Sequence, residues 1–179
     1  MSLEIIIGPM FSGKTTHAIS FIRKQRFIGS NVLAIKPQID MRYSSDNVII
    51  SHDKDFVPCL VWDSSNPLEY SSIFDQIDYV VIEEAQFFKG LYSFVKQLLF
   101  KHKNVLLVGL DGDAKQEKFG EILDCIPYAT HIQKLNALCL GCKGTSLAPF
   151  TKKLVSDLEQ IDVGSSEKYM SVCLKHLLS

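Results

Sequence analysis

An eight-residue motif near the N-terminus constrains the fold of this chain more than any other feature. Residues 8–15 read G-P-M-F-S-G-K-T, which matches the pattern G-x-x-x-x-G-K-[ST]. A β-branched run at 3–7 precedes the motif, and helical spacing follows it from Lys14 to about Phe27. A glycine-rich turn of this kind aims backbone N–H groups at phosphates, and the following helix adds its positive N-terminal end. The motif therefore predicts a phosphate-binding loop in which Lys14 reaches the β- and γ-phosphates and Thr15 ligates Mg²⁺.

Apolar strand patterns alternate with helical patterns after this motif. We expect strands at 32–36, 57–62, 78–82 and 104–110, helices at 67–76 and 90–102, and a loop at 38–48. Strands that alternate with helices indicate βαβ units. The sequence therefore predicts an α/β fold with a mostly parallel sheet and helices on both of its faces.

The pattern changes at Ala137, where metal-type side chains begin. We expect no long strand and no regular helix from there to Ser179. The expected division is an α/β nucleotide-binding domain over 1–136 and a small zinc-stapled module over 137–179.

The strand expected at 78–82 ends in two acids, Glu83 and Glu84. Acids at the carboxyl edge of a parallel sheet lie on the side where phosphates bind. One acid can hold Mg²⁺, and the next can polarise a nucleophile. The plain alternative is that the two carboxylates only solvate a strand end, and the phosphate-loop motif favours the functional interpretation.

Four side chains in the C-terminal segment have the spacing of a metal site. Cys139 and Cys142 form C-x2-C, and Cys173 and His176 form C-x2-H further along the chain. Each two-residue spacer lets both ligands of a pair reach one ion, and three thiolates with one imidazole suit tetrahedral Zn²⁺. The set leaves no open position, so we expect a structural zinc ion. The alternative keeps Cys173 as a core thiol and His176 as a surface residue.

Charge and composition exclude several classes of protein. Lys and Arg number 19 and Asp and Glu number 20, which gives a net charge of -1 in 179 residues. A protein that coats nucleic acid usually carries a basic excess. No run reaches the roughly 18 apolar residues that span a bilayer, and residues 1–4 lack the basic start of a secretory signal. We expect a cytoplasmic protein with no membrane partner and no direct nucleic-acid partner.

Several local motifs together resemble one family, the thymidine kinases found in animal cytosol, in many bacteria and in large DNA viruses. The phosphate loop has that family's Pro-Met-Phe filling. Further similar motifs are Asp40-Met41-Arg42-Tyr43, Ser51-His52-Asp53, Glu83-Glu84-Ala85-Gln86-Phe87-Phe88, Leu110-Asp111-Gly112, Phe119-Gly120, Phe150-Thr151-Lys152-Lys153-Leu154 and Lys168-Tyr169-Met170-Ser171-Val172-Cys173. The resemblance covers nearly the whole chain.

The resemblance implies phosphate transfer from ATP to the 5′-hydroxyl of thymidine, and of deoxyuridine, in nucleoside salvage. It makes Glu84, Lys14 and Arg42 catalytic and assigns Mg²⁺ to Thr15 and Glu83. The implied ATP and phosphate contacts are Gly8, Pro9, Met10, Phe11, Ser12, Gly13, Lys14, Thr15, Asp40, Arg42 and Gln86. The implied nucleoside contacts are Met10, Phe87, Leu110, Ala114, Phe119, Thr151, Ile161, Val163, Gly164 and Tyr169. A homotetramer and feedback inhibition by thymidine triphosphate are also implied.

Four departures from the family pattern bear on this site. Glu83 stands where Asp is usual, and Ala85 replaces a Gly. Asp113-Ala114 replaces Thr-Phe, which removes one aromatic wall of the nucleoside pocket. His176 replaces a fourth Cys, an exchange that zinc sites tolerate.

Two other interpretations of the motifs stay open at the level of sequence. One is an ATPase in which hydrolysis drives motion, although no arginine finger or second mechanical domain is apparent. The other is a zinc-stabilised nucleic-acid-binding module without catalysis, which the net charge of -1 disfavours.

Overall fold

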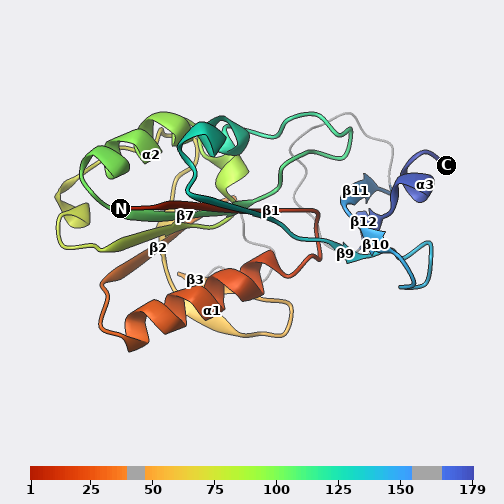
Figure 1. Cartoon of the computed structure of the whole chain (residues 1–179), viewed down its shortest axis with the longest axis horizontal. Coiled ribbons are helices and arrows are strands. Elements are labelled where there is room, and N and C mark those ends of the chain that lie inside the picture. Colours follow the sequence, from red (N-terminus) through yellow and green to blue (C-terminus); the bar gives the residue numbers. More distant parts are fainter. Residues whose placement is uncertain (40–46, 155–166) are drawn as a thin grey trace.

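The central feature of the computed structural model is a parallel sheet that is covered on both faces (Figure 1). The structure describes residues 1–39, 47–154 and 167–179. Its six-stranded sheet has the order β5-β2-β6-β7-β1-β8, and each neighbouring pair of strands is parallel. The strands are β1 (Leu3–Ile7), β2 (Val32–Pro37), β5 (Leu60–Trp62), β6 (Tyr79–Ile82), β7 (Asn104–Gly109) and β8 (His131–Lys134). This architecture confirms the α/β prediction.

Helix α1 (Lys14–Phe27) covers one face of the sheet, together with a ribbon of β3 (Val48–Ile50) and β4 (Phe56–Pro58). Helix α2 (Leu91–Phe100) and the 3₁₀ helices η1 (Ser72–Phe74), η2 (Ala85–Phe87) and η3 (Ile122–Tyr128) pack on the other face. Successive side chains of a strand point to opposite faces. Accordingly, Ile5 and Ile7 pack with α2, whereas Ile6 packs with α1. None of the helices in the described ranges is both long and apolar enough to cross a membrane.

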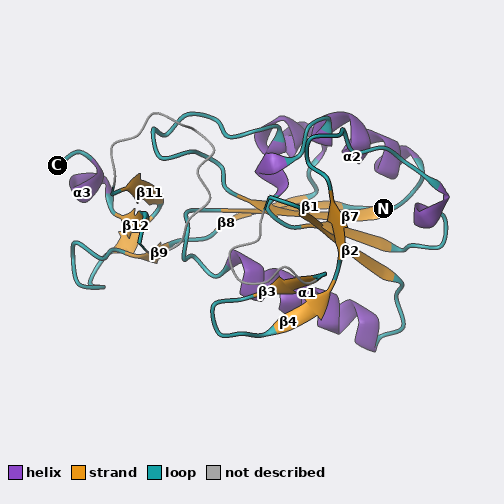
Figure 2. Cartoon of the chain, turned by 180° about the vertical axis from the view of Figure 1, so that it is seen from behind, coloured by secondary structure: helices purple, strands orange, loops and turns teal. Residues whose placement is uncertain are grey.

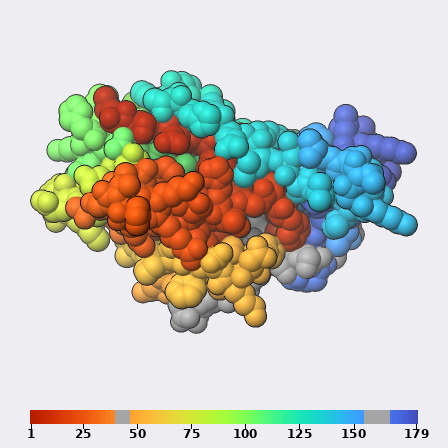
Figure 3. Space-filling model, turned by 60° about the horizontal axis from the view of Figure 1, so that its bottom comes forward, coloured from red at the N-terminus to blue at the C-terminus, as the bar shows by residue number. Residues whose placement is uncertain are grey.

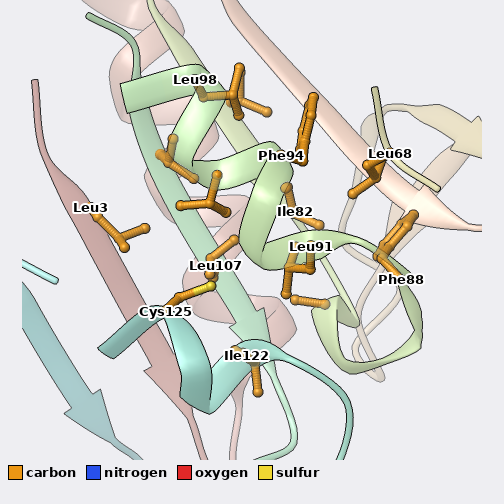
Figure 4. Close-up of a cluster of buried hydrophobic side chains, with 14 of the residues drawn as sticks. Leu3, Leu68, Ile82, Phe88, Leu91, Phe94, Leu98, Leu107, Ile122 and Cys125 are labelled. Carbon is orange, nitrogen blue, oxygen red and sulfur yellow. The ribbon is translucent and has the colours of Figure 1, made fainter. Parts of the chain in front are cut away.

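The larger core lies under α2 (Figure 4). Leu91, Phe94, Val95 and Leu98 of α2 are all buried, at the i, i+3, i+4, i+7 spacing of one helical face. The Phe94 ring meets the Phe74 ring edge to face, with centroids 5.3 Å apart. Cys125 is fully buried in the same cluster, and this burial raises the pKa of its thiol to about 12. Cys125 is therefore an inert core residue.

A carboxylate from a distant loop fixes the start of α2. The two Glu121 oxygens accept hydrogen bonds from the Gly90 and Tyr92 backbone N–H groups, at 3.0 and 2.9 Å. The first N–H groups of a helix have no intrahelical partner, and a negative charge there also complements the helix dipole. The contact joins α2 to the segment that leads into η3.

The C-terminal elements gather beyond the carboxyl ends of the central strands (Figure 2). They are β9 (Ala137–Leu138), β10 (Leu147–Ala148), β11 (Phe150–Lys153), β12 (Tyr169–Val172) and the short helix α3 (Leu174–Leu177). β9 pairs with β10 and β11 with β12, both antiparallel. Figure 3 shows the blue C-terminal residues as a lobe at one end of the molecule. The lobe has its own small core of Ala137, Cys139, Ala148 and Val172. The division at residues 136 and 137 stays a prediction.

Several expected elements differ from those observed. The helix expected at 67–76 is only the 3₁₀ turn η1, preceded by Pro67, which lacks a backbone N–H. The single strand expected at 57–62 is two strands in different sheets, because β4 ends at Pro58 and pairs with β3 while β5 joins the central sheet. β8 was not expected, since Ile132 is its only apolar residue and the strand lies at a sheet edge. The C-terminal strands are short, as expected.

The two phenylalanines of α2 offer a matched test of this core. Phe94→Ala removes a fully buried ring and is expected to lower the free energy of unfolding by about 3–5 kcal/mol. Phe100 on the same helix is 76% exposed, so Phe100→Ala should change it by less than about 0.5 kcal/mol. Urea denaturation of both variants measures the difference, and equal losses would contradict the packing described for α2.

Candidate active site

The loop between β1 and α1 is held by hydrogen bonds between its side chains and its own backbone. Gly8 and Gly13 have φ values of 148° and 83°, which favour glycine. A Cβ on Gly8 would lie 2.5 Å from the Leu135 carbonyl oxygen. The Pro9 carbonyl oxygen accepts hydrogen bonds from Lys14 Nζ at 2.7 Å and from Ser12 Oγ at 2.8 Å. The buried ammonium of Lys14 is therefore held over the loop, at the N-terminal end of α1.

A hydroxyl and a carboxylate meet at the first turn of α1. Thr15 Oγ1 donates a hydrogen bond to Glu83 Oε1 at 2.5 Å. Thr15 follows β1 and Glu83 follows β6, and β7 lies between these two strands in the sheet. The extra methylene of Glu83 relative to Asp therefore still allows contact with Thr15. Hydroxyl and carboxylate oxygens are hard ligands that suit Mg²⁺ beside bound phosphates. The two residues fit the predicted magnesium site by their chemistry and by their place next to the loop.

Glu84 adopts an unusual backbone conformation and has a side-chain partner. Its φ and ψ are 50° and 46°, in the left-handed region that non-glycine residues enter at a cost of about 1–3 kcal/mol. Its Oε2 accepts a hydrogen bond from Gln86 Nε2 at 2.6 Å. Gln86 Oε1 accepts one from the Leu110 backbone N–H at 3.0 Å. Strain of this kind persists where the surroundings hold a residue in place, as these contacts do here.

One cavity brings the phosphate loop and the two acids together. Its lining residues are Met10, Phe11, Ser12, Gly13, Lys14, Thr15, Thr16, Ile49, Ile50, His52, Glu83, Glu84 and Leu110. Sequence reasoning gave no role to Ile49, Ile50 or His52, although His52 belongs to a quoted motif. The His52 ring stands 5.4 Å from the Phe11 ring, centroid to centroid. The cavity thus combines a cation, two carboxylates and apolar walls from several elements.

The C-terminal lobe contacts the phosphate loop directly. Thr151 Oγ1 on β11 accepts a hydrogen bond from the Met10 backbone N–H at 2.9 Å. The Thr151 carbonyl accepts another from Gln116 Nε2 at 3.1 Å. A second cavity lies along this junction and includes Pro9, Gly112, Phe150 and Thr151 among its walls. The buried Thr151 therefore lies between the phosphate loop and the loop that follows β7.

Aromatic side chains pack beside the acids. The Phe87 and Phe119 rings meet edge to face, with centroids 5.4 Å apart. Tyr169 on β12 is buried, and Lys153 Nζ lies 5.8 Å from its ring centroid. Ala114 is half-buried in the loop after β7. The structure thus pairs two of the predicted nucleoside contacts with each other, while Tyr169 contacts its own β-ribbon.

The four predicted zinc ligands converge. The ligand atoms of Cys139, Cys142, Cys173 and His176 all lie within 4.8 Å of one another. His176 Nδ1 lies 3.6, 3.5 and 3.3 Å from the Sγ atoms of Cys139, Cys142 and Cys173, and the last two Sγ atoms are 3.8 Å apart. Usual zinc bond lengths give tetrahedral edges of about 3.8 Å between two sulfurs and about 3.6 Å between sulfur and nitrogen. The four side chains therefore fit a zinc ion bound through Nδ1.

The local electrostatics also suit a metal. A hydrogen bond with the His176 ring lowers the pKa of the Cys173 thiol to about 6, which favours the thiolate that metals bind. Cys139 Sγ accepts the Cys173 backbone N–H at 3.2 Å. Gly141 makes room for the imidazole, because a Cβ there would lie 2.6 Å from His176 Cδ2. Gly141 is thus a supporting position that the spacing of the ligands did not reveal.

Comparisons with known proteins decide the family. A family model described as thymidine kinase matches residues 1–177. The thymidine kinase of Yaba monkey tumor virus is 36% identical, over 96% of this chain and 91% of that protein. The thymidine kinase of Acanthamoeba polyphaga mimivirus is 38% identical, over 99% and 82%, and that of Oryza sativa is 35% identical, over 98% and 66%. The chain belongs to the thymidine kinase family.

Not all residues that the family resemblance implies can be located. Asp40, Arg42, Ile161, Val163 and Gly164 lie outside the described residues. Lys14, Thr15, Glu83, Glu84, Met10 and Leu110 line one cavity. Gln86 contacts Glu84 but is not among the residues that line this cavity, so its predicted phosphate contact stays a prediction.

The pairing of Gly141 with His176 gives a test of the metal site. Gly141→Ala should weaken zinc binding about 10- to 100-fold, the usual effect of disturbing a ligand's support, because its methyl group displaces the imidazole. His176→Cys should retain zinc, and Gly141→Ala in that background should cause no further loss. Zinc retention against a competing chelator measures all three variants. Equal retention by the parent and Gly141→Ala would contradict ligation by His176 in this geometry.

Proposed function

We propose that this thymidine kinase family member transfers the γ-phosphoryl group of ATP to the 5′-hydroxyl of thymidine, giving ADP and thymidine monophosphate. The observation that carries the proposal is the cavity shared by Lys14, Thr15, Glu83 and Glu84. It combines a phosphate-binding loop with a carboxylate that can receive a proton. Family membership supplies the nucleoside.

The phosphate end of the reaction relies on the loop and on α1. Lys14 exchanges its contact with the Pro9 carbonyl for the β- and γ-phosphates, while loop N–H groups bind the remaining oxygens. Thr15 and Glu83 would hold Mg²⁺, which when bound neutralises charge on the phosphate oxygens. By resemblance, Asp40 lies near the metal and Arg42 contacts phosphate. Phosphoryl transfer depends mainly on such positioning and charge stabilisation.

Glu84 is the proposed general base. It accepts the 5′-hydroxyl proton as the hydroxyl oxygen bonds to the γ-phosphorus and the bond to the ADP oxygen breaks. Its partner Gln86 donates to one of the two carboxylate oxygens, Oε2. The strained backbone of Glu84 is consistent with a residue held for chemistry rather than for stability.

The nucleoside contacts come from the β7 side and from the C-terminal lobe. Met10 and Thr151 are the proposed neighbours of the thymine methyl group, and Phe87 and Phe119 pack on the base. Leu110, Ala114 and Tyr169 complete the described walls, and the resemblance adds Ile161, Val163 and Gly164. Because Ala114 replaces an aromatic residue, we expect the pocket to accept bulky 5-substituted pyrimidines.

Several further properties are proposed on the resemblance. The zinc ion is structural and fixes the ends of the C-terminal lobe, since its four ligands leave no open position. The thiol ligands suit the reducing cytoplasm, where nucleoside salvage supplies DNA synthesis. Feedback inhibition by thymidine triphosphate and a homotetramer complete the proposal.

Phosphate transfer from γ-labelled ATP across a nucleoside panel tests the function. Thymidine and deoxyuridine should be phosphorylated, whereas deoxycytidine and deoxyguanosine should not. A site built for the acceptor–donor edge of thymine leaves buried groups unpaired against cytosine, at about 1–3 kcal/mol each. Release of phosphate without any labelled nucleoside would instead support an ATPase, and deoxycytidine turnover that rivals thymidine would contradict the proposed specificity.

Two substitutions separate nucleotide binding from catalysis. Lys14→Ala should abolish turnover, whereas Lys24→Ala on the exposed side of the same helix should not. Glu84→Gln should lower kcat by about 10²–10⁴, the usual contribution of a general base, while ATP binding persists. Steady-state kinetics and a nucleotide-binding assay measure both effects. If Glu83→Gln proved the inactive variant with metal binding intact, the roles of the two acids would be reversed.

A further inference from the structure

The buried amide of Gln86 links the proposed base to the end of β7. We propose that Gln86 is a positioning residue that orients the Glu84 carboxylate, rather than a phosphate ligand. The inference rests on the proposed role of Glu84. It gives a functional role to a side chain that is buried in the protein.

The hydrogen bonds of Gln86 determine which way its amide faces. The Leu110 backbone N–H is a donor, so the Gln86 oxygen must face it, at 3.0 Å. The Gln86 NH₂ group then faces Glu84 Oε2, at 2.6 Å. A flipped amide would break both contacts, so the neighbours select one orientation.

Two glycines fix Gln86 at both its ends. A Cβ on Gly109 would overlap Gln86 Oε1, and a Cβ on Gly120 would overlap the Gln86 carbonyl oxygen. Gly109 ends β7, while Gly120 lies before η3. Gln86 itself is only 3% exposed. The residue is thus enclosed between β7 and the η3 segment, and its amide connects the Leu110 N–H to Glu84.

Because of its position, Gln86 should affect kcat rather than ATP binding. Gln86 is absent from the walls of the cavity that contains the phosphate loop, whereas Glu84 is one of them. The other titratable side chains along these walls are Lys14 on α1, Glu83 after β6 and His52 after β3. These groups remain in place when Gln86 is substituted. A fall in kcat with little change in either KM then reports the lost amide contact.

The test compares Gln86→Met, which is apolar and of similar length, with the parent enzyme. We expect kcat for thymidine to fall about 10- to 100-fold and both KM values to change less than about threefold. Gln86→Glu keeps an acceptor for the Leu110 N–H but loses the amide donor to Glu84, so its kcat should fall as well.

Other outcomes overturn the inference. A raised KM for ATP with unchanged kcat would make Gln86 a phosphate ligand. A loss of kcat with comparable changes in both KM values would make its role purely structural. Thermal melting and zinc content check folding, and if Gln86→Met does not fold, the isosteric Gln86→Glu carries the test.

A double-substitution cycle separates this inference from the proposed function. If Gln86 acts through Glu84, Gln86→Met should cost little in a Glu84→Gln background, where the carboxylate is already absent. Additive losses in the double variant would contradict the inference while leaving the base assignment intact. A fully active Glu84→Gln variant would instead remove the base assignment itself.

Discussion

The parallel pairing of β1, β7 and β6 is the constraint on which the rest of the site depends. Parallel strands bring their carboxyl ends to one edge, so the phosphate loop, Leu110 and the acids at 83 and 84 start from neighbouring positions. The hydrogen bond between Thr15 and Glu83 then spans the end of β7. Apolar side chains on both faces of these strands hold their register against α1 and α2. The core under the helices therefore determines how far apart the phosphate loop and the acids at 83 and 84 lie.

The C-terminal lobe is joined to this arrangement at the phosphate loop. Its contacts with the loop include the hydrogen bond from the Met10 N–H to Thr151 and the packing of Phe11 against the core of the lobe. β11 carries Thr151 and pairs with β12, which leads into the ligand Cys173. A metal that fixes the end of β12 thus also fixes the position of Thr151. In the proposed reaction, the zinc site acts on the nucleoside pocket through this ribbon and takes no part in the chemistry.

Local sequence signals predicted the parts of the site that depend on spacing, but not those that depend on packing. The phosphate loop and the four metal ligands were predictable because their function requires fixed intervals along the chain. The contact between Gln86 and Leu110, and the space that Gly141 leaves for His176, join residues far apart in sequence, and no periodicity marks them. β8 was not predicted, because an edge strand with one apolar residue has little hydrophobic pattern. The 67–76 segment was predicted as a helix, but the Leu68 N–H donates to the Lys89 carbonyl and only residues 72–74 form a 3₁₀ turn.

The departures from the family pattern are compensated by their neighbours. Glu83 is longer than the usual Asp, and its carboxylate still reaches Thr15. The backbone before Ala85 turns at Glu84, which adopts the left-handed conformation. Two hydrogen bonds of the Gln86 amide connect the Glu84 carboxylate to the Leu110 N–H, just after β7. His176 needs more room than the Cys it replaces, and Gly141 provides that room. In each case the altered side chain depends on a neighbour, so the effect of replacing that neighbour depends on which side chain is present.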